Sequence, residues 1–268
     1  MNPRAFSSLA AAADVLRSAH EPGAPLVLAN VWDPPSARLV ERAGFAIVAT
    51  SSAAMLASLG YEDGGGAPLD MVFTALARIA AAVRVPVTAD IEDGYGLDAT
   101  DLVSRLLSAG VVGCNLEDSD HSHPGGLVDP TSQAQRITAI KAAGRTAGVD
   151  VVVNARIDTY IAGSGDPSSR LDDALRRAEI YVGAGADCVY PILIPDDQAP
   201  GFLMAHRGPV NMIANADADA INRLAALGAA RISLGPRLWS ETFRLAGALL
   251  DDLCRRAQPA RTVKGSSA

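Results

Sequence analysis

Two acidic residues, Asp90 and Glu92, follow a short apolar run in the sequence. The run begins at residue 85 and has the character of a buried parallel strand, and the glycines at 94 and 96 place the two acids at its C-terminal end. Because strand side chains alternate between two faces, residues two apart are predicted to point the same way. Like charges on one face repel unless a cation lies between them, so this spacing predicts a divalent metal ion.

Further acids come from neighbouring segments of the chain. Glu117 lies at the end of the next predicted strand, and Asp63 lies in the loop after an earlier one. With only oxygen ligands at the strand ends, such a site selects Mg²⁺, or Mn²⁺, over Zn²⁺. Arg156 lies at the end of the fifth predicted strand, and its planar guanidinium suits bidentate binding of a substrate carboxylate or phosphonate. The alternative is that Arg156 only pairs with these carboxylates in a structural ion network.

The loop over residues 119–126 follows the fourth predicted strand and contains two histidines. Its glycines and polar residues suit a mobile lid over the site. A histidine titrates near neutral pH and can act as a general acid, and we predict this catalytic role for His123. The alternative is that His121 and His123 are both solvated loop residues.

Eight apolar segments are predicted to be the strands that position these residues. They cover residues 26–32, 45–50, 85–92, 111–118, 151–158, 188–194, 210–215 and 231–234. Helical patterns alternate with them, and four helices are predicted to end at a glycine that leads directly into a strand. Eight such units predict an α/β fold that closes as a TIM-type (β/α)8 barrel. An open doubly wound sheet is the alternative, but its glycine-rich fingerprint after the first strand is missing.

A barrel gathers the C-terminal ends of its strands at one mouth, and that is where the polar residues of this sequence are concentrated. The strand starts are almost wholly apolar. The polar positions are Asn30, Trp32, Asp33, Ser51, Ser52, Asp90, Glu92, Asp93, Asn115, Glu117, Asp118, Asn154, Arg156, Asp158, Asn211, Asn215 and Ser233.

Two further helices flank the predicted barrel. One is expected over residues 6–19, and a last helix with a broad apolar stripe is expected over residues 238–255. No linker-like stretch divides the chain, which predicts one barrel domain over residues 1–256. The polar tail over residues 257–268 is predicted to be disordered.

The composition limits the possible partners of the chain. It has 268 residues, 49% of them hydrophobic, and a formal net charge of −7. The acidic balance, without a Lys/Arg cluster, predicts neither nucleic acid nor a membrane as a partner. A cytoplasmic location is expected, because residues 1–20 lack a secretory signal pattern and no run reaches the roughly 18 apolar residues of a membrane span. Three widely spaced cysteines predict neither disulfides nor a thiolate metal site.

Six motifs in the right order resemble the isocitrate lyase and phosphoenolpyruvate mutase superfamily, over about residues 30–237. The central motif, residues 90–96 (DIEDGYG), is similar to the superfamily's D-x-D-x-G-[YF]-G. The other motifs are Ser51-Ser52, residues 58–63 (SLGYED), 115–118 (NLED), 154–158 (NARID) and 209–211 (PVN). No single motif is specific, but six in order are.

The resemblance implies a TIM-type barrel whose C-terminal helices are exchanged between the subunits of a homodimer or homotetramer. It also implies that Asp90 binds Mg²⁺, while the waters of the ion are held by Asp63, Glu92 and Glu117. An α-keto or enolate oxygen of the substrate is expected on the metal. The resemblance assigns the carboxylate of this small acid to Ser51, Ser52, Arg156 and Asn211.

The sequence departs from the superfamily in the residues that transfer protons. Isocitrate and methylisocitrate lyases carry a K-[KR]-C-G-H lid, whose Cys is the catalytic acid, and the loop here contains neither Lys nor Cys. It also lacks the Lys and Asn that phosphoenolpyruvate mutases keep in the lid. Ile192 stands where the lyases place a Glu, and Glu92 replaces the usual Asp. The binding half of the site is therefore predicted to be intact, and the proton-transferring half is predicted to differ.

These observations predict a Mg²⁺-dependent lyase that cleaves, or hydrolyses, a carbon-carbon bond of a small 2-oxo or 2-hydroxy carboxylic acid. A metal-stabilised enolate would carry the charge that develops as the bond breaks. Two alternatives stay open. One is a phosphonomutase or another enzyme acting on a phosphonate C–P bond, and the other is a non-catalytic barrel that binds keto acids.

Overall fold

The computed structural model describes residues 8–64, 66–123, 125–162 and 166–257, and it contains a strand at each of the eight predicted places. Each strand is shorter than predicted, because the flanking apolar residues belong to the connecting turns. The strands are β1 with β2 (Leu26–Leu28 and Asn30–Val31), β3 (Val48–Thr50), β4 (Val87–Asp90), β5 (Gly113–Glu117), β8 (Val152–Ile157), β9 (Cys188–Pro191), β10 (Asn211–Ile213) and β11 (Arg231–Ser233).

These strands are parallel and close into a ring. One sheet has the order β2-β3-β4-β5-β8-β9, and a second has the order β1-β11-β10. The two sheets share one extended segment, since β1 pairs with β11 and β2 pairs with β3. A parallel bridge between Val189 and Val210 joins β9 to the residue before β10. The fold is therefore the predicted (β/α)8 barrel.

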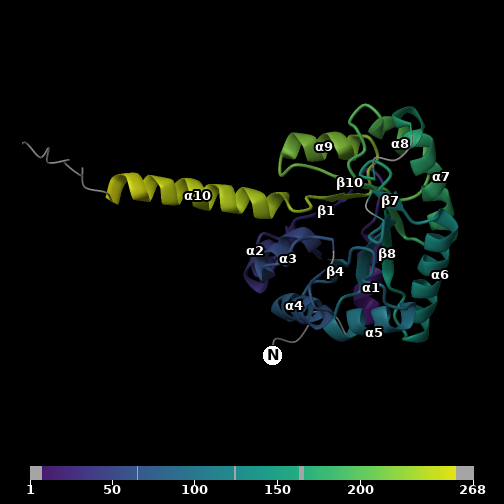
Figure 1. Ribbon diagram of the computed structural model, residues 1–268, viewed down its shortest axis with the longest axis horizontal. Coiled ribbons are helices and arrows are strands. Elements are labelled where there is room, and N and C mark those ends of the chain that lie inside the picture. The colour runs from purple at the N-terminus through teal and green to yellow at the C-terminus, as the bar shows by residue number, and fades with distance from the viewer. Residues whose placement is uncertain (1–7, 65, 124, 163–165, 258–268) are drawn as a thin grey trace, which may run out of the picture.

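Helices surround the ring, and one of them leaves it (Figure 1). The helices are α1 (Leu9–Ser18), α2 (Pro34–Arg42), α3 (Ser52–Leu59), α4 (Leu69–Ala82), α5 (Ala99–Ala109), α6 (Pro130–Thr146), α7 (Arg170–Gly183), α8 (Ala199–Ala205), α9 (Ala218–Ala226) and α10 (Arg237–Ala257), with a 3₁₀ turn, η1, at Pro167–Ser169. Figure 1 shows α10, in yellow, extending away from the barrel.

The predicted turn chemistry is present at both ends of the helices. Glycines 44, 110, 185 and 228 all have left-handed backbones, with φ between 82° and 103°, which is the conformation that glycine adopts after a helix without strain. At the other end, side chains cap free backbone N–H groups. Such caps are Asp33, Asp98, Asp129 and Asp217.

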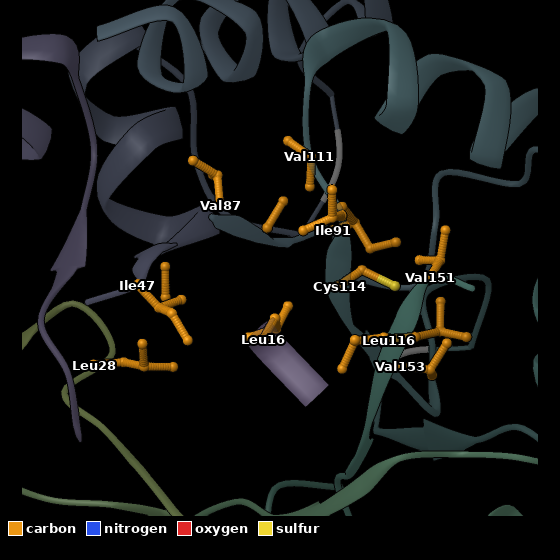
Figure 2. Close-up of a cluster of buried hydrophobic side chains, with 14 of the residues drawn as sticks. Leu16, Leu28, Ile47, Val87, Ile91, Val111, Cys114, Leu116, Val151 and Val153 are labelled. Carbon is orange, nitrogen blue, oxygen red and sulfur yellow. The ribbon is translucent and has the colours of Figure 1, made fainter. Parts of the chain in front are cut away.

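The N-terminal end of the barrel is closed by α1. Its residue Leu16 is fully buried, and Figure 2 shows it surrounded by strand side chains such as Leu28, Val87 and Val153. A Cβ on Gly113 of β5 would lie 2.5 Å from Leu16 Cδ2. Leu16 of α1 can therefore pack inside the barrel only because residue 113 has no side chain.

Other sequence expectations are refined by the structure. The helix expected over residues 6–19 is α1, capped by Ser8, which accepts a hydrogen bond from Ala11 N. The predicted lid contains a short antiparallel hairpin of β6 (Ser119–Asp120) and β7 (Gly126–Leu127). The tail over residues 258–268 lies outside the described residues, and the domain boundary at residue 256 stays a prediction. In the described part of the chain, no helix is both long and apolar enough to cross a membrane.

Candidate active site

A cavity of about 290 Å³ opens at the C-terminal mouth of the barrel. Each of the eight strands contributes a lining residue, either from its own C-terminal half or from the position directly after it. In ring order these residues are Asn30, Ser51, Asp90, Asn115, Arg156, Tyr190, Ile213 and Ser233. Barrel enzymes hold their catalytic groups at this end, so the cavity is the candidate active site.

Asp90, the last residue of β4, is held in the cavity by the start of α3. The backbone N and the Oγ of Ser52 donate to Asp90 Oδ2 at 3.2 and 2.9 Å. The backbone N of Asp90 donates to the Thr50 hydroxyl at 3.0 Å. A hydroxyl and the positive end of a helix therefore stabilise one side of the carboxylate. Its other oxygen, Oδ1, is buried and has no hydrogen-bond partner among the described residues.

The guanidinium of Arg156 reaches the cavity already oriented by two carboxylates. Its Nε and Nη2 donate to the oxygens of Asp158 at 2.7 and 2.8 Å, and its Nη1 lies 2.7 Å from Glu117 Oε2. Burial acts to lower the pKa of Arg156, but the charges of Asp158 and Glu117 outweigh it and raise that pKa, so the side chain stays charged. The ion network considered for Arg156 is thus present, and two of its five N–H groups are left for a ligand.

The two loop histidines are placed differently. His121 Nε2 lies 2.7 Å from Glu117 Oε1, whereas His123 Nδ1 lies 2.9 Å from Asp120 Oδ2 and its side chain is 80% exposed. The structure therefore does not bring His123 to the acids of the site. Glu117 itself is buried, and burial raises its carboxyl pKa above the usual range against the opposing charge of Arg156.

Glu92 departs from the alternation that the sequence predicts. β4 ends at Asp90, and the backbone of Glu92 is left-handed, with φ of 51°. Its side chain lines a neighbouring cavity of about 270 Å³, which His121 also lines. Burial, followed by the charges of Asp63 and Asp90, raises the pKa of Glu92 to about 7. The two carboxyl groups thus face different cavities but still interact electrostatically.

Three of the remaining predicted residues line the cavity at the barrel mouth, and one does not. Ser51, Ser52 and Asp63 lie on its wall, and the Ser51 hydroxyl also caps α3 by accepting a hydrogen bond from Ala54 N at 3.4 Å. Asn211 is fully buried, and its Nδ2 donates to Ser233 Oγ at 3.3 Å. It is not among the described lining residues of the cavity.

The carboxylates fit a cation that keeps most of its water. In the described ranges, no three His, Cys, Asp or Glu side chains converge closely enough to bind a metal directly. Asp90 Oδ1 and Glu92 Oε1 are nevertheless buried acceptors without a described donor, which is costly unless a cation is near. Mg²⁺ is usually bound through one or two carboxylates and several waters. The resemblance implies that Asp90 would hold such an ion directly and that Glu92, Asp63 and Glu117 would act through water.

Sequence reasoning placed Asp158 and Asn115 at the barrel mouth but gave them no role. Asp158 orients Arg156, Asn115 lines the cavity, and each lies two residues from a predicted site residue on the same strand face. That spacing is the signal that could have assigned them to the site. The contact of His121 with Glu117 depends on the loop path and has no such signal. An apolar wall was also missed, formed by Ile161, Ile192, Leu193 and Ile213.

The sequence and the fold of this chain are similar to those of known proteins. A sequence model of the family described as phosphoenolpyruvate phosphomutase matches residues 16–253. An uncharacterized protein of Mycobacterium tuberculosis (strain H37Rv) is 35% identical over 218 residues, which cover 81% of this chain and 80% of that protein. The 2-methylisocitrate lyase of Bacillus subtilis (strain 168) is 32% identical over 219 residues, which cover 78% of this chain and 65% of that enzyme. Among solved structures, a candidate phosphonomutase from Burkholderia cenocepacia J2315 has a TM-score of 0.83 at 37% identity, covering 89% of this chain and 98% of that one.

Proposed function

The chain belongs to the phosphoenolpyruvate phosphomutase family, and from this premise we propose that it is a Mg²⁺-dependent lyase acting on a small 2-oxo or 2-hydroxy carboxylic acid. It cleaves, or hydrolyses, a carbon-carbon bond of that acid. Relatives with a named activity are enzymes of the PEP mutase/isocitrate lyase superfamily, among them lyases and mutases. The observation that carries the proposal is the Asp90 carboxylate, whose Oδ1 is buried without a hydrogen-bond partner in the described part of the chain, beside a cavity that Arg156 also lines.

The chain's own residues bind and orient the acid. Arg156 offers its two unused N–H groups to a carboxylate, and Asp158 keeps the guanidinium from turning away. Ser52 fixes the direction of the Asp90 carboxylate. When bound, Mg²⁺ supplies positive charge that lowers the free energy of an enolate. Ile161, Ile192 and Leu193 line an apolar side of the same cavity.

The size of the cavity supports a small substrate. Its volume of about 290 Å³ lies at the lower end of the range for ligand pockets. Arg156 and the Asp90 side of the cavity suit the oxidised, anionic end of an acid, while the apolar wall suits a short alkyl group. Acids of about three to six carbons match this division.

A second candidate function is cleavage or rearrangement of a phosphonate C–P bond. The family description and the candidate phosphonomutase at 37% identity favour it. Arg156 binds a phosphonate with the same geometry as a carboxylate. The two functions therefore differ in the bond that breaks and not in the residues that bind.

Both candidates are tested by one substrate panel in MgCl₂. Oxaloacetate, citramalate-type 2-hydroxy acids and phosphonopyruvate are incubated with the enzyme, and substrate loss, carbon products and phosphate release are measured separately. We expect loss of a C–C substrate with formation of its two cleavage products, abolished by EDTA and reduced at least about a hundredfold in Asp90→Ala. Asp172→Ala is the matched control, because Asp172 is exposed on α7 and is not among the described residues that line the cavity.

Turnover confined to phosphonopyruvate would favour the second candidate. Full activity in Asp90→Ala, or in EDTA, would contradict both. A third result, with no turnover in the panel and no Mg²⁺-dependent binding of oxalate, would also overturn the proposal, since oxalate resembles a small planar enolate.

A further inference from the structure

A buried arginine lies inside the barrel below the active-site cavity. Arg231, the first residue of β11, is 1% exposed, and its Nη2 donates to Asn115 Oδ1 at 2.9 Å. Its Nε and Nη1 have no partner among the described residues. A buried cation with so few partners is unfavourable for folding, because desolvation is not offset. The position of Arg231 therefore calls for a reason other than stability.

The contact with Arg231 fixes which way the Asn115 amide faces. A guanidinium carries donors only, so the Asn115 atom beside it must be the oxygen. The same Oδ1 accepts a second hydrogen bond, at 2.9 Å, from Nδ2 of Asn154, its neighbour in register on β8. Both bonds hold the oxygen toward the barrel interior. The amide nitrogen is thereby turned to the other side.

The other side of Asn115 is the active-site cavity. Asn115 lines it and pairs in register with Asp90 on β4. Within the described residues, Asn115 Nδ2 makes no hydrogen bond, and both hydrogen bonds of the Asn115 side chain are to Oδ1. The amide thus presents free N–H groups beside Asp90. A nitrogen donor cannot bind Mg²⁺, and its partner must be an anionic or carbonyl oxygen of the ligand.

We propose that Asn115 binds substrate by donating its amide N–H to an anionic oxygen of the small acid, and that Arg231 is a positioning residue that holds the amide in this orientation. The inference rests on the proposed function and adds a contact to it. Without Arg231, only the Asn154 amide still holds this oxygen. The two amides can then turn together, so that Asn115 presents its oxygen, which repels an anion. The buried charge is thus retained for ligand recognition.

The test uses oxalate in MgCl₂ as the probe, at pH 8, with calorimetric titration and thermal unfolding of each variant. Asn115→Asp keeps an oxygen for Arg231 but replaces the donor with negative charge. We expect an unchanged or higher Tm and oxalate binding weakened about a hundredfold. Arg231→Met removes the buried charge at similar volume, so we expect no loss of Tm, oxalate binding weakened about tenfold, and Mg²⁺ affinity within about twofold of wild type.

Two further variants separate positioning from packing. Arg231→Lys keeps a donor-only cation and should recover most of the oxalate affinity lost in Arg231→Met. Cys188→Ala is the control, because Cys188 is buried on β9 and is not part of the described cavity lining. This variant should lower Tm, because removing the sulfur leaves an empty space in the core, and it should leave oxalate binding unchanged.

The outcomes distinguish this inference from the proposed function. If wild type binds oxalate and both Asn115→Asp and Arg231→Met bind it equally well, the inference alone is wrong. If Arg231→Met loses Tm but not oxalate affinity, Arg231 is structural and the positioning role is wrong. A wild type that does not bind oxalate in MgCl₂ overturns both the inference and the function on which it rests.

Discussion

At the scale of single residues, two histidines only two positions apart face different surroundings. His121 touches Glu117 and lines the cavity that Glu92 also lines, while His123 pairs with Asp120 at the surface. A residue can transfer a proton only within hydrogen-bond reach of the reacting groups. His123 lines neither described cavity, so we propose that His121, through its contact with Glu117, takes the proton-transfer role predicted for His123.

Paired substitutions test this assignment. We expect His121→Asn to lower kcat at least about tenfold on the substrate found in the panel, and His123→Asn to stay within about twofold of wild type. The two changes are chemically identical and lie in one loop, so each controls for the other. Steady-state kinetics are sufficient. The reverse pattern would restore the assignment of His123 and would mean that the loop moves in the complex.

The raised pKa of Glu92 predicts how metal binding depends on pH. With a pKa of about 7, Glu92 is largely protonated at pH 6 and ionised at pH 8 in the metal-free protein. A cation favours the ionised carboxylate, so Mg²⁺ should displace its proton and bind about tenfold more tightly at pH 8 than at pH 6. Titration calorimetry in two buffers of different ionisation enthalpy would measure the released proton. Glu92→Gln should reduce the pH dependence, and an affinity that falls with rising pH would contradict the assignment.

At the scale of elements, the barrel depends on how α1 and β5 meet. Leu16 fills the space that a side chain on Gly113 would need, and Thr88 Oγ1 and the Val152 carbonyl lie 3.1 Å from the same point. The Val152 carbonyl on β8 and the backbone of β5 cannot move without disturbing the pairing of these two strands, and β5 carries Asn115 and Glu117. The core contact and the active site therefore share one strand.

Gly113→Ala should consequently destabilise the fold. We expect the free energy of unfolding to fall by about 1–3 kcal/mol, because overpacking forces Leu16 or the backbone to shift. Urea denaturation measures the change. Gly183→Ala is the matched control: Gly183 lies in α7, nothing stands within 4 Å of the added Cβ, and its φ is not left-handed. It should be neutral or stabilising by up to about 1 kcal/mol. Equal effects of the two substitutions would contradict the packing argument.

At the scale of the whole molecule, α10 is the feature that the isolated chain leaves unexplained. It extends away from the barrel (Figure 1), and five of its large apolar side chains are 51–61% exposed. These residues are Phe243, Leu245, Leu249, Leu250 and Leu253. A contiguous exposed apolar face of this kind marks an interaction site. We propose that α10 packs against a second copy of the chain in a homodimer or homotetramer.

This proposal predicts the mass of the protein in solution. Light scattering on a gel-filtration column should give two or four times the 27.6 kDa of one chain. Leu249→Glu should shift the mass toward one chain, because a charge cannot be buried in an apolar interface without a partner. Ala248→Glu is the control, since it lies three or four residues from Arg244 and Asp251, on the polar side of the helix. A wild-type protein of 27.6 kDa would contradict the proposal.

The sequence by itself determined the elements and the side chains that gather at one end of them. Strand alternation, glycine at helix ends and the count of eight units predicted the barrel, because these depend on local backbone chemistry. The convergence of Ser51, Ser52, Asp90 and Arg156 followed from the same rule, since parallel strands deliver their C-terminal ends to one mouth. Within the superfamily, the motifs also indicated the class of chemistry.

Only the tertiary structure decided the contacts made across the barrel. The left-handed backbone at Glu92 interrupts the alternation of side chains. The path of the loop brings His121, and not His123, to Glu117. The donor-only guanidinium of Arg231, 116 residues from Asn115 along the chain, set the direction of that amide. Such contacts arise from residues brought together by ring closure, and no periodicity within one segment encodes them. Local sequence therefore determined which groups reach the mouth, and long-range packing determined what each group can touch.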